Sequence, residues 1–249
     1  MLQINTTPNY AGVTISGDFL DFDALYEALH EVTGEENDFP HYYSAKIRVF
    51  ALCYDLRHAL MGDRDITFID NGMDADKMKY MSVITSEKNV YLTIQMLWPE
   101  LLFVTIALND FVKLYGAKQS KDRFTYLQDK HNIWDRNIAQ VRMFQAAVAS
   151  CLKEELTPNM FSRTMNMLNG RYFSVGGYIT QYIDVLNEQF LQMNKEKRMK
   201  SISLMAKRLT ELNGDYQDIR EIVREAAARY GCPPDDVRLN VEYPEEIEW

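Results

Sequence analysis

Arg57 is the residue of this chain best suited to chemistry at a ligand site. It lies in a helix predicted over residues 42–61, and on a helical wheel it falls inside the apolar arc of that helix. A buried arginine almost always has a carboxylate partner, and Asp110 is a candidate by its chemistry. The planar guanidinium could equally hold an anionic ligand. Two interpretations of Arg57 stay open, a structural ion pair and an anion-binding group.

A polar stripe on a later helix would extend this site. Residues 99–115 are apolar on almost every side of the predicted helix, which is typical of a buried central helix. Asn109, Asp110 and Lys113 fall on one stripe of it. Because an unpaired buried polar group costs about 1–3 kcal/mol, the stripe is either a wet edge or one wall of a cleft. In a cleft, Arg57, Asp110 and Lys113 would be the catalytic candidates, and Asn109 would bind the ligand.

A second candidate for ligand binding precedes the helix predicted over residues 178–193. Arg171, Ser174 and the backbone of Gly176 and Gly177 come just before it. Backbone amides at a helix N-terminus can hold an anion. The same glycines also suit a simple turn, so both interpretations stay open.

Two carboxylate–histidine pairs raise the hypothesis of a metal site. Glu27 and His30, and likewise Asp55 and His58, have the spacing used in carboxylate-bridged dimetal proteins. On the helical wheel both pairs point away from the apolar face of their helix. We therefore expect no metal and no other cofactor.

Motifs typical of catalysis are missing from the sequence. It contains no GxSxG, HExxH, GxGxxG or P-loop pattern. Whether the protein is an enzyme is therefore left open at this point.

The net charge of −9 is unevenly distributed. Residues 1–100 hold 16 acidic and 7 basic side chains, residues 101–234 hold 14 and 19, and residues 235–249 hold 6 and one. The predicted helix over residues 195–212 is the densest basic stretch and could bind an acidic protein partner. Alternatively, it is a bundle helix with a solvated basic face. Nucleic acid is not an expected partner, because the chain as a whole is acidic.

The cysteines and the N-terminus predict a cytoplasmic location. Cys53, Cys151 and Cys232 are far apart and odd in number, which is typical of reduced thiols. The N-terminal residues show no basic start followed by an apolar run, so no secretory signal is expected.

Residues 90–109 are apolar enough to span a bilayer if they formed a single helix. Their first half alternates between apolar and polar residues, which indicates a strand. Pro99 then favours a new helix, with Glu100 in its first turn. We predict a strand over about 89–97 and a helix over 99–115 that ends at Gly116, with no membrane span.

The other elements of the first half predict an α+β fold. A hairpin over residues 1–16, a short strand at Ile66 and Phe68, and a second hairpin over 77–97 give about five strands in one antiparallel sheet. The helices expected to pack on it cover residues 21–33 and 42–61.

After Gly116 the pattern is all helical. The predicted helices cover residues 132–155, 158–169, 178–193, 196–212 and 215–230. We divide the chain into an α+β part (1–116), a helical part (117–234) and an acidic extended tail (235–249). Because the helix over 99–115 should pack against both parts, they are expected to be continuous.

Three segments carry a resemblance to a known family: NYAGVTISGDFLDFDALYEALHE, LCYDLRHALMGDRDITFIDNGMD and NVYLTIQMLWPELLFVTIALNDF. They resemble an uncharacterised bacterial protein family of unknown function. The resemblance implies a bacterial cytoplasmic protein and supplies no activity, substrate or catalytic residue.

Two hypotheses of function follow. The favoured one is a soluble interaction protein without catalytic activity that associates with itself, supported by the missing motifs, the segregated charge and the 13 methionines. The alternative is an enzyme or small-anion-binding protein that uses a polar cleft around Arg57 and Asp110.

Overall fold

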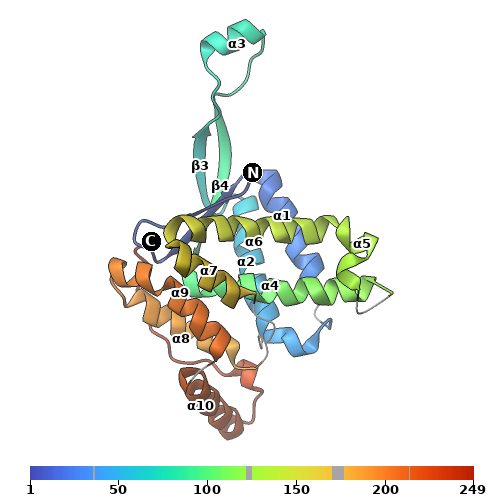
Figure 1. The fold of residues 1–249 in the computed structure, drawn as a ribbon. Helices are drawn as coiled ribbons and strands as arrows, with labels where there is room; N and C mark the ends of the chain where they lie inside the picture. The colour runs from blue at the N-terminus through green and yellow to red at the C-terminus, as the bar shows by residue number, and fades with distance from the viewer. Residues whose placement is uncertain (36, 122–124, 170–176, 213) are drawn as a thin grey trace.

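The N-terminal half of the chain forms one antiparallel sheet with the spatial order β1-β2-β4-β3 (Figure 1). The structure, a computed structural model, describes residues 1–35, 37–121, 125–169, 177–212 and 214–249. The strands are β1 (Gln3–Thr6), β2 (Gly12–Gly17), β3 (Asp65–Asp70) and β4 (Lys88–Leu97). The expected α+β class is confirmed, with four strands in place of about five.

Helices cover the sheet and make up most of the second half. They are α1 (Phe19–Thr33), α2 (Tyr43–Leu60), α3 (Ala75–Met81), α4 (Trp98–Gln119), α5 (Lys130–Ile133), α6 (Arg136–Glu155), α7 (Pro158–Leu168), α8 (Ile179–Leu191), α9 (Lys195–Glu211) and α10 (Gly214–Tyr230). Short 3-10 turns occur at Pro40–Tyr42, Tyr126–Gln128 and Pro234–Asp236. None of the described helices is both long and apolar enough to cross a membrane.

The hairpin expected over residues 77–97 is wrong. The first part of this segment is helix α3, and β4 pairs with β3 in a register that places Phe68 opposite Val90. The Asp74 carboxylate accepts a hydrogen bond from the Lys77 amide (2.8 Å) and so caps α3. The apolar side chains of Tyr80, Met81, Val83 and Ile84 are exposed, so no buried face imposes the strand period on this first part of the segment.

Helix α4 continues beyond the end expected at Gly116. The carbonyl of this buried glycine accepts a hydrogen bond from Asn132 Nδ2 at 3.0 Å. A Cβ atom at Gly116 would lie 3.1 Å from the same nitrogen. Gly116 therefore allows residues 126–133 to approach the helix closely, and it does not end the helix.

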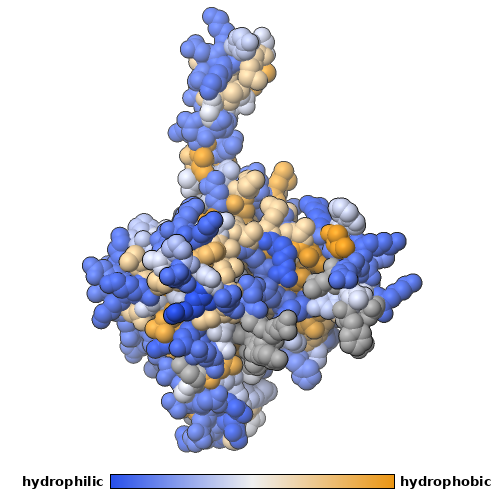
Figure 2. All heavy atoms as spheres, viewed as in Figure 1, coloured by the Kyte–Doolittle hydropathy of each residue, from blue (hydrophilic) through white to orange (hydrophobic). Residues whose placement is uncertain are grey.

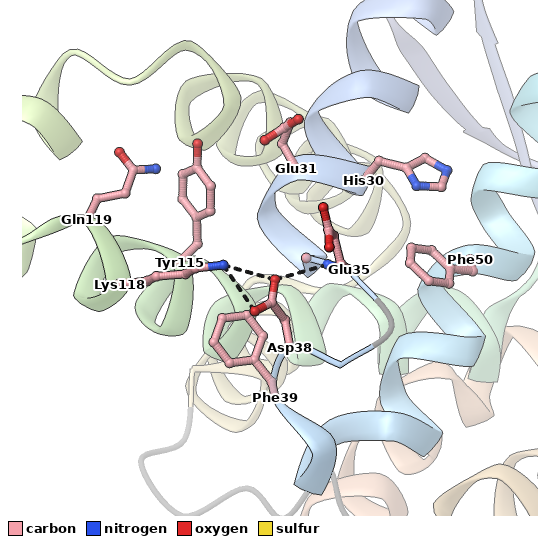
Figure 3. A pocket seen from close by; sticks show the side chains of 10 residues that line it. His30, Glu31, Glu35, Asp38, Phe39, Phe50, Tyr115, Lys118 and Gln119 are labelled. Carbon is pink, nitrogen blue, oxygen red and sulfur yellow. Dashed lines mark hydrogen bonds and ion pairs between the residues drawn. The ribbon is translucent and has the colours of Figure 1, made fainter.

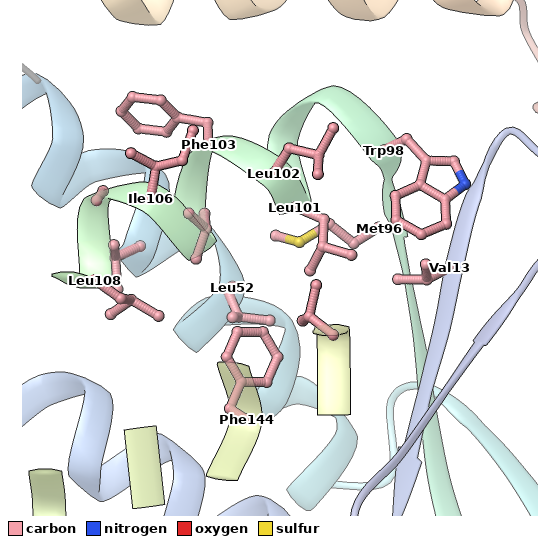
Figure 4. Packing of buried hydrophobic residues seen from close by; sticks show 14 of the residues in the cluster. Val13, Leu52, Met96, Trp98, Leu101, Leu102, Phe103, Ile106, Leu108 and Phe144 are labelled. Atoms are coloured by element: carbon pink, nitrogen blue, oxygen red, sulfur yellow. The ribbon is translucent and has the colours of Figure 1, made fainter. Parts of the chain in front are cut away.

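Helix α4 lies at the centre of the hydrophobic core. Leu52 of α2, Val13 of β2 and Phe144 of α6 belong to the same buried cluster as its side chains (Figure 4). From the second half, α8 and α9 also pack against it. One continuous core therefore includes elements from both halves of the chain.

A largely buried ionic network joins α2, α4 and α8. The Arg48 guanidinium lies 2.7 Å from the Asp184 carboxylate and 3.3 Å from that of Glu100, and it donates to the Thr180 carbonyl at 2.7 Å. Only 11% of the Arg48 side chain is exposed. Burial lowers the pKa of Arg48, but the two carboxylates outweigh it and raise the pKa above its ordinary value. Arg48 is therefore charged and connects the two halves.

We expect Arg48→Met to lower the free energy of unfolding by about 3–5 kcal/mol, because the variant leaves two partly buried carboxylates without their cation. Arg64→Met is the matched control. The Arg64–Asp55 pair has the same 2.7 Å separation, but its side chains are 35% and 37% exposed. Its loss should cost about 1 kcal/mol or less. Urea unfolding measures both values, and equal losses would contradict the role given to Arg48.

Candidate interaction surface

The structure does not bring Arg57 and Asp110 together. Arg57 is exposed on α2, and its guanidinium carbon lies 5.7 Å from the centre of the Tyr54 ring. Asp110 instead pairs with Lys113 one turn along α4, at 2.9 Å. The expectation of a buried Arg57 is wrong because the core-facing stripe of α2 lies to one side of it. That stripe consists of Val49, Leu52, Cys53, Leu56 and Ala59.

Asn109 holds helices together. Its Nδ2 donates to the Leu168 carbonyl at 3.1 Å, and its Oδ1 accepts from Arg142 (2.5 Å) and Gln145 (3.2 Å). The side chain therefore connects α4 with α6 and the end of α7. A small cavity of about 200 Å³ adjoins these groups. The other two ligand-binding candidates, Arg171 and Ser174, lie outside the described residues.

The two carboxylate–histidine pairs are not part of a metal centre in the described chain. His30 stacks on Phe50, with ring centres 4.9 Å apart, and His58 lies 3.3 Å from Asp63. Among the described residues, no group of three or more histidine, cysteine and carboxylate side chains could hold a metal ion.

The two arginines of the predicted basic helix, α9, make contacts inside the molecule, while its four lysines are exposed. Arg198 is buried and donates to the carbonyls of Phe190 (3.3 Å) and Leu191 (2.7 Å) at the end of α8. It also donates to the carbonyls of Asn9 and Glu248, and so holds the tail against the N-terminal loop. Arg208 bonds to the Gln189 side chain at 2.7 Å. These contacts show that α9 is a packed helix, and its exposed lysines form a solvated basic face on which the acidic partner stays a prediction.

A long arm projects from the body of the molecule. It consists of residues 65–91, with β3 and the outer part of β4 as its stalk and α3 at its tip (Figure 1). Figure 2 shows apolar residues among the hydrophilic ones along it. The large apolar side chains of the arm that are 41–102% exposed are Ile66, Phe68, Tyr80, Met81, Val83, Ile84 and Val90. The arm therefore carries a group of seven exposed apolar side chains on a single protruding segment.

In the stalk, the face of the sheet that is buried within the body extends beyond the helices and becomes exposed to solvent. Side chains alternate along β4, so Val90 lies on the same face as the buried Leu92 and Ile94. The strand register places Phe68 opposite Val90 and Ile66 opposite Leu92. The face that packs against helices within the body is thus uncovered at Phe68 (64% exposed) and Val90 (50%).

The sequence alone contained only half of this signal. The alternation of Ile66 and Phe68 predicted a strand, but it could not show that the strand extends beyond the helices that cover the sheet.

A family model matches residues 2–249, arm included. The chain belongs to the family described as a domain of unknown function (DUF6904). No curated protein and no solved structure matches the chain.

Membership of this family supplies no activity. The prediction of an uncharacterised family is confirmed, and the description of the family gives neither a substrate nor a partner. Support for the arm as an interaction surface therefore comes from the structure of the arm alone.

We expect Arg57→Ala to change the free energy of unfolding by about 1 kcal/mol or less, because an exposed cation over a ring contributes about that much. Urea unfolding of the variant and the wild-type protein measures the change. A loss of about 3–5 kcal/mol, which removal of a buried ion-pair partner would cause, would contradict the exposed position of Arg57.

Proposed function

We propose that this protein is a non-catalytic interaction protein that associates with a second copy of itself through its arm. The observation that carries the proposal is the apolar face of residues 65–91, which nothing in the described chain covers. Exposed apolar side chains that gather on one part of a molecule, rimmed by polar residues, can mark a protein–protein interaction site. The alternative of a catalytic or anion-binding cleft has less support, because Arg57 and Asp110 lie apart.

A second copy is the partner that the chemistry of the arm favours. In a two-fold dimer the same patch occurs on both subunits, so an apolar face can complement itself. An anionic lipid surface would instead select basic residues. The arm carries Asp65, Asp70, Asp74, Asp76 and Glu87 against Lys77, Lys79 and Lys88. This excess of acidic groups disfavours a membrane as the partner.

Charge also indicates how two arms would meet. β3 is an edge strand, and unpaired edges can recruit a strand from another chain. However, β3 begins and ends with an acid, at Asp65 and Asp70. Antiparallel pairing of two β3 strands would bring Asp65 of one copy close to Asp70 of the other, and like charges facing each other are destabilising. We therefore favour packing of the apolar faces over pairing of the edges.

We also place the protein in the bacterial cytoplasm. The free thiols of Cys53, Cys151 and Cys232 support a reducing compartment. The resemblance to a bacterial family supports the source.

Phe68→Ser should weaken self-association at least about tenfold, because loss of a buried aromatic anchor typically costs 2 kcal/mol or more. Sedimentation velocity over a concentration series measures the change. Trp134→Ser is the control, since Trp134 is 85% exposed but lies on the α5 side of the body. A wild-type protein that stays monomeric, or equal weakening by both variants, would overturn the proposal.

Removal of residues 73–87 tests the arm without touching the body. It leaves Asn71 and Gly72 between Asp70 and Lys88, which already face each other in the sheet. Asn-Gly is a favoured two-residue hairpin turn. We expect an unchanged melting temperature at a concentration where both proteins are monomeric, together with weaker self-association. A destabilised body would show that the tip contributes to folding, against its exposure in the structure.

A further inference from the structure

A cavity of about 870 Å³ lies on the body, away from the arm. Its lining residues come from the end of α1, α2, the end of α4 and the loop residues Gly34, Glu35, Asp38 and Phe39 (Figure 3). This volume is within the range of small-molecule sites in proteins.

Aromatic rings form two sides of the cavity. Tyr115 and Phe39 lie on one side, and Phe50 and His30 lie on the other (Figure 3). The His30 ring is held between Tyr26 and Phe50, with ring centres 4.6 and 4.9 Å away. The Tyr115 hydroxyl is fixed by a hydrogen bond to Asp135 at 3.3 Å. These rings are therefore positioned before any ligand arrives.

The backbone at Phe39 is strained. Its φ of 52° and ψ of 58° are left-handed values, which a bulky side chain rarely adopts. Strain of this kind costs about 1–3 kcal/mol and is common at ligand clamps. Here it places an aromatic ring at the wall of the cavity.

Carboxylates outnumber cations around the cavity. Glu31, Glu35 and Asp38 line it, and the lining cation is Lys118. The Lys118 ammonium is bound by both oxygens of Asp38 at 3.0 Å. Within the described chain, neither Glu31 nor Glu35 takes part in an ion pair. Two carboxylates therefore remain to face a ligand between the aromatic walls.

Other charges near the cavity do not reverse this balance. The Lys46 ammonium is bound to the carbonyls of Glu35 and Asp38, and Lys46 is not a lining residue. Burial lowers the pKa of His30, and Arg57 lowers it further, while Glu27 and Glu31 act in the opposite direction. His30 is therefore mainly neutral at pH 7 and adds no positive charge.

We propose that this cavity binds a small organic cation, held by its aromatic walls together with Glu31 and Glu35. An ammonium group over an aromatic face is attracted by the ring, and the attraction is larger when the group is desolvated. An anion would face the excess of carboxylates instead. The inference is independent of the arm, because no residue of the arm lines the cavity.

Covalent chemistry has no support at this site. Cys53 and His30 both line the adjoining hollow, and a Cys–His pair is the arrangement that activates a thiol. Burial raises the pKa of the Cys53 thiol to about 12, and no hydrogen bond joins it to His30 in the described chain. The site is therefore assigned to binding alone.

Isothermal titration calorimetry of the whole protein with choline, and separately with putrescine, tests the proposal. We expect at least one of the two to bind, and we expect no heat from the neutral isostere of choline, in which carbon replaces the nitrogen. If neither cation binds, or if the neutral isostere binds as well as choline, the proposal is overturned.

Variants locate the binding. The double variant Glu31→Gln/Glu35→Gln should weaken it at least about tenfold, since tenfold corresponds to 1.4 kcal/mol. Phe50→Leu should weaken it about fivefold through the lost ring. Glu221→Gln removes an exposed carboxylate from α10 and should leave it within about twofold of wild type.

Thermal melting of each variant guards against misfolding. Glu31 and Glu35 are exposed, so their replacement should leave the melting temperature unchanged even if Phe50→Leu does not. Binding that the glutamine variants leave unaltered would show that the cation binds elsewhere, and this would overturn the proposal.

Discussion

Burial of nearly every side chain from Trp98 to Leu108 of helix α4 is the constraint on which the rest of this fold depends. Its side chains are apolar on nearly every side, and Trp98, Phe103 and Phe111 are fully buried. Each such side chain contributes about 1.5–3 kcal/mol when it leaves water. No single sheet or helix can cover a cylinder on all sides, so α1 and α2 must cover one part and α8 and α9 another. The two halves of the chain are thus bound to one core.

A core of this size also buries charged side chains, and the protein stabilises two buried arginines in different ways. Arg48 is stabilised by the carboxylates of Glu100 and Asp184, which keep its charge in place. Arg198 is stabilised by backbone carbonyls, and burial lowers its pKa. The first arrangement links helices that are distant in sequence. The second supplies hydrogen-bond donors to the buried carbonyls at the end of α8 while also fixing the tail. Both arginines therefore serve packing, although the sequence marks neither of them.

Local signals were sufficient to predict most of the elements. Thr157 and Pro158 start a helix as expected, and the alternation along β4 marks a strand that ends before Trp98. The wrong predictions are those that depended on which other elements pack against a helix. Gly116 has the appearance of a helix stop, but a neighbouring turn needs its small size. Arg57 shares an arc with apolar residues, but no element of the described chain buries it there. Periodicity shows which residues share a face, and only tertiary packing decides whether that face is buried or binds a ligand.

The separation of the arm from the core has an evolutionary consequence. Substitutions at an exposed position usually change the free energy of folding by less than about 0.5 kcal/mol. Side chains such as Tyr80 and Ile84 make no contribution to the buried cluster. Natural selection could therefore alter the tip without risk to the fold, while the residues around α4 stay constrained. Proteins built on this plan can diverge in what they recognise and still keep the same body.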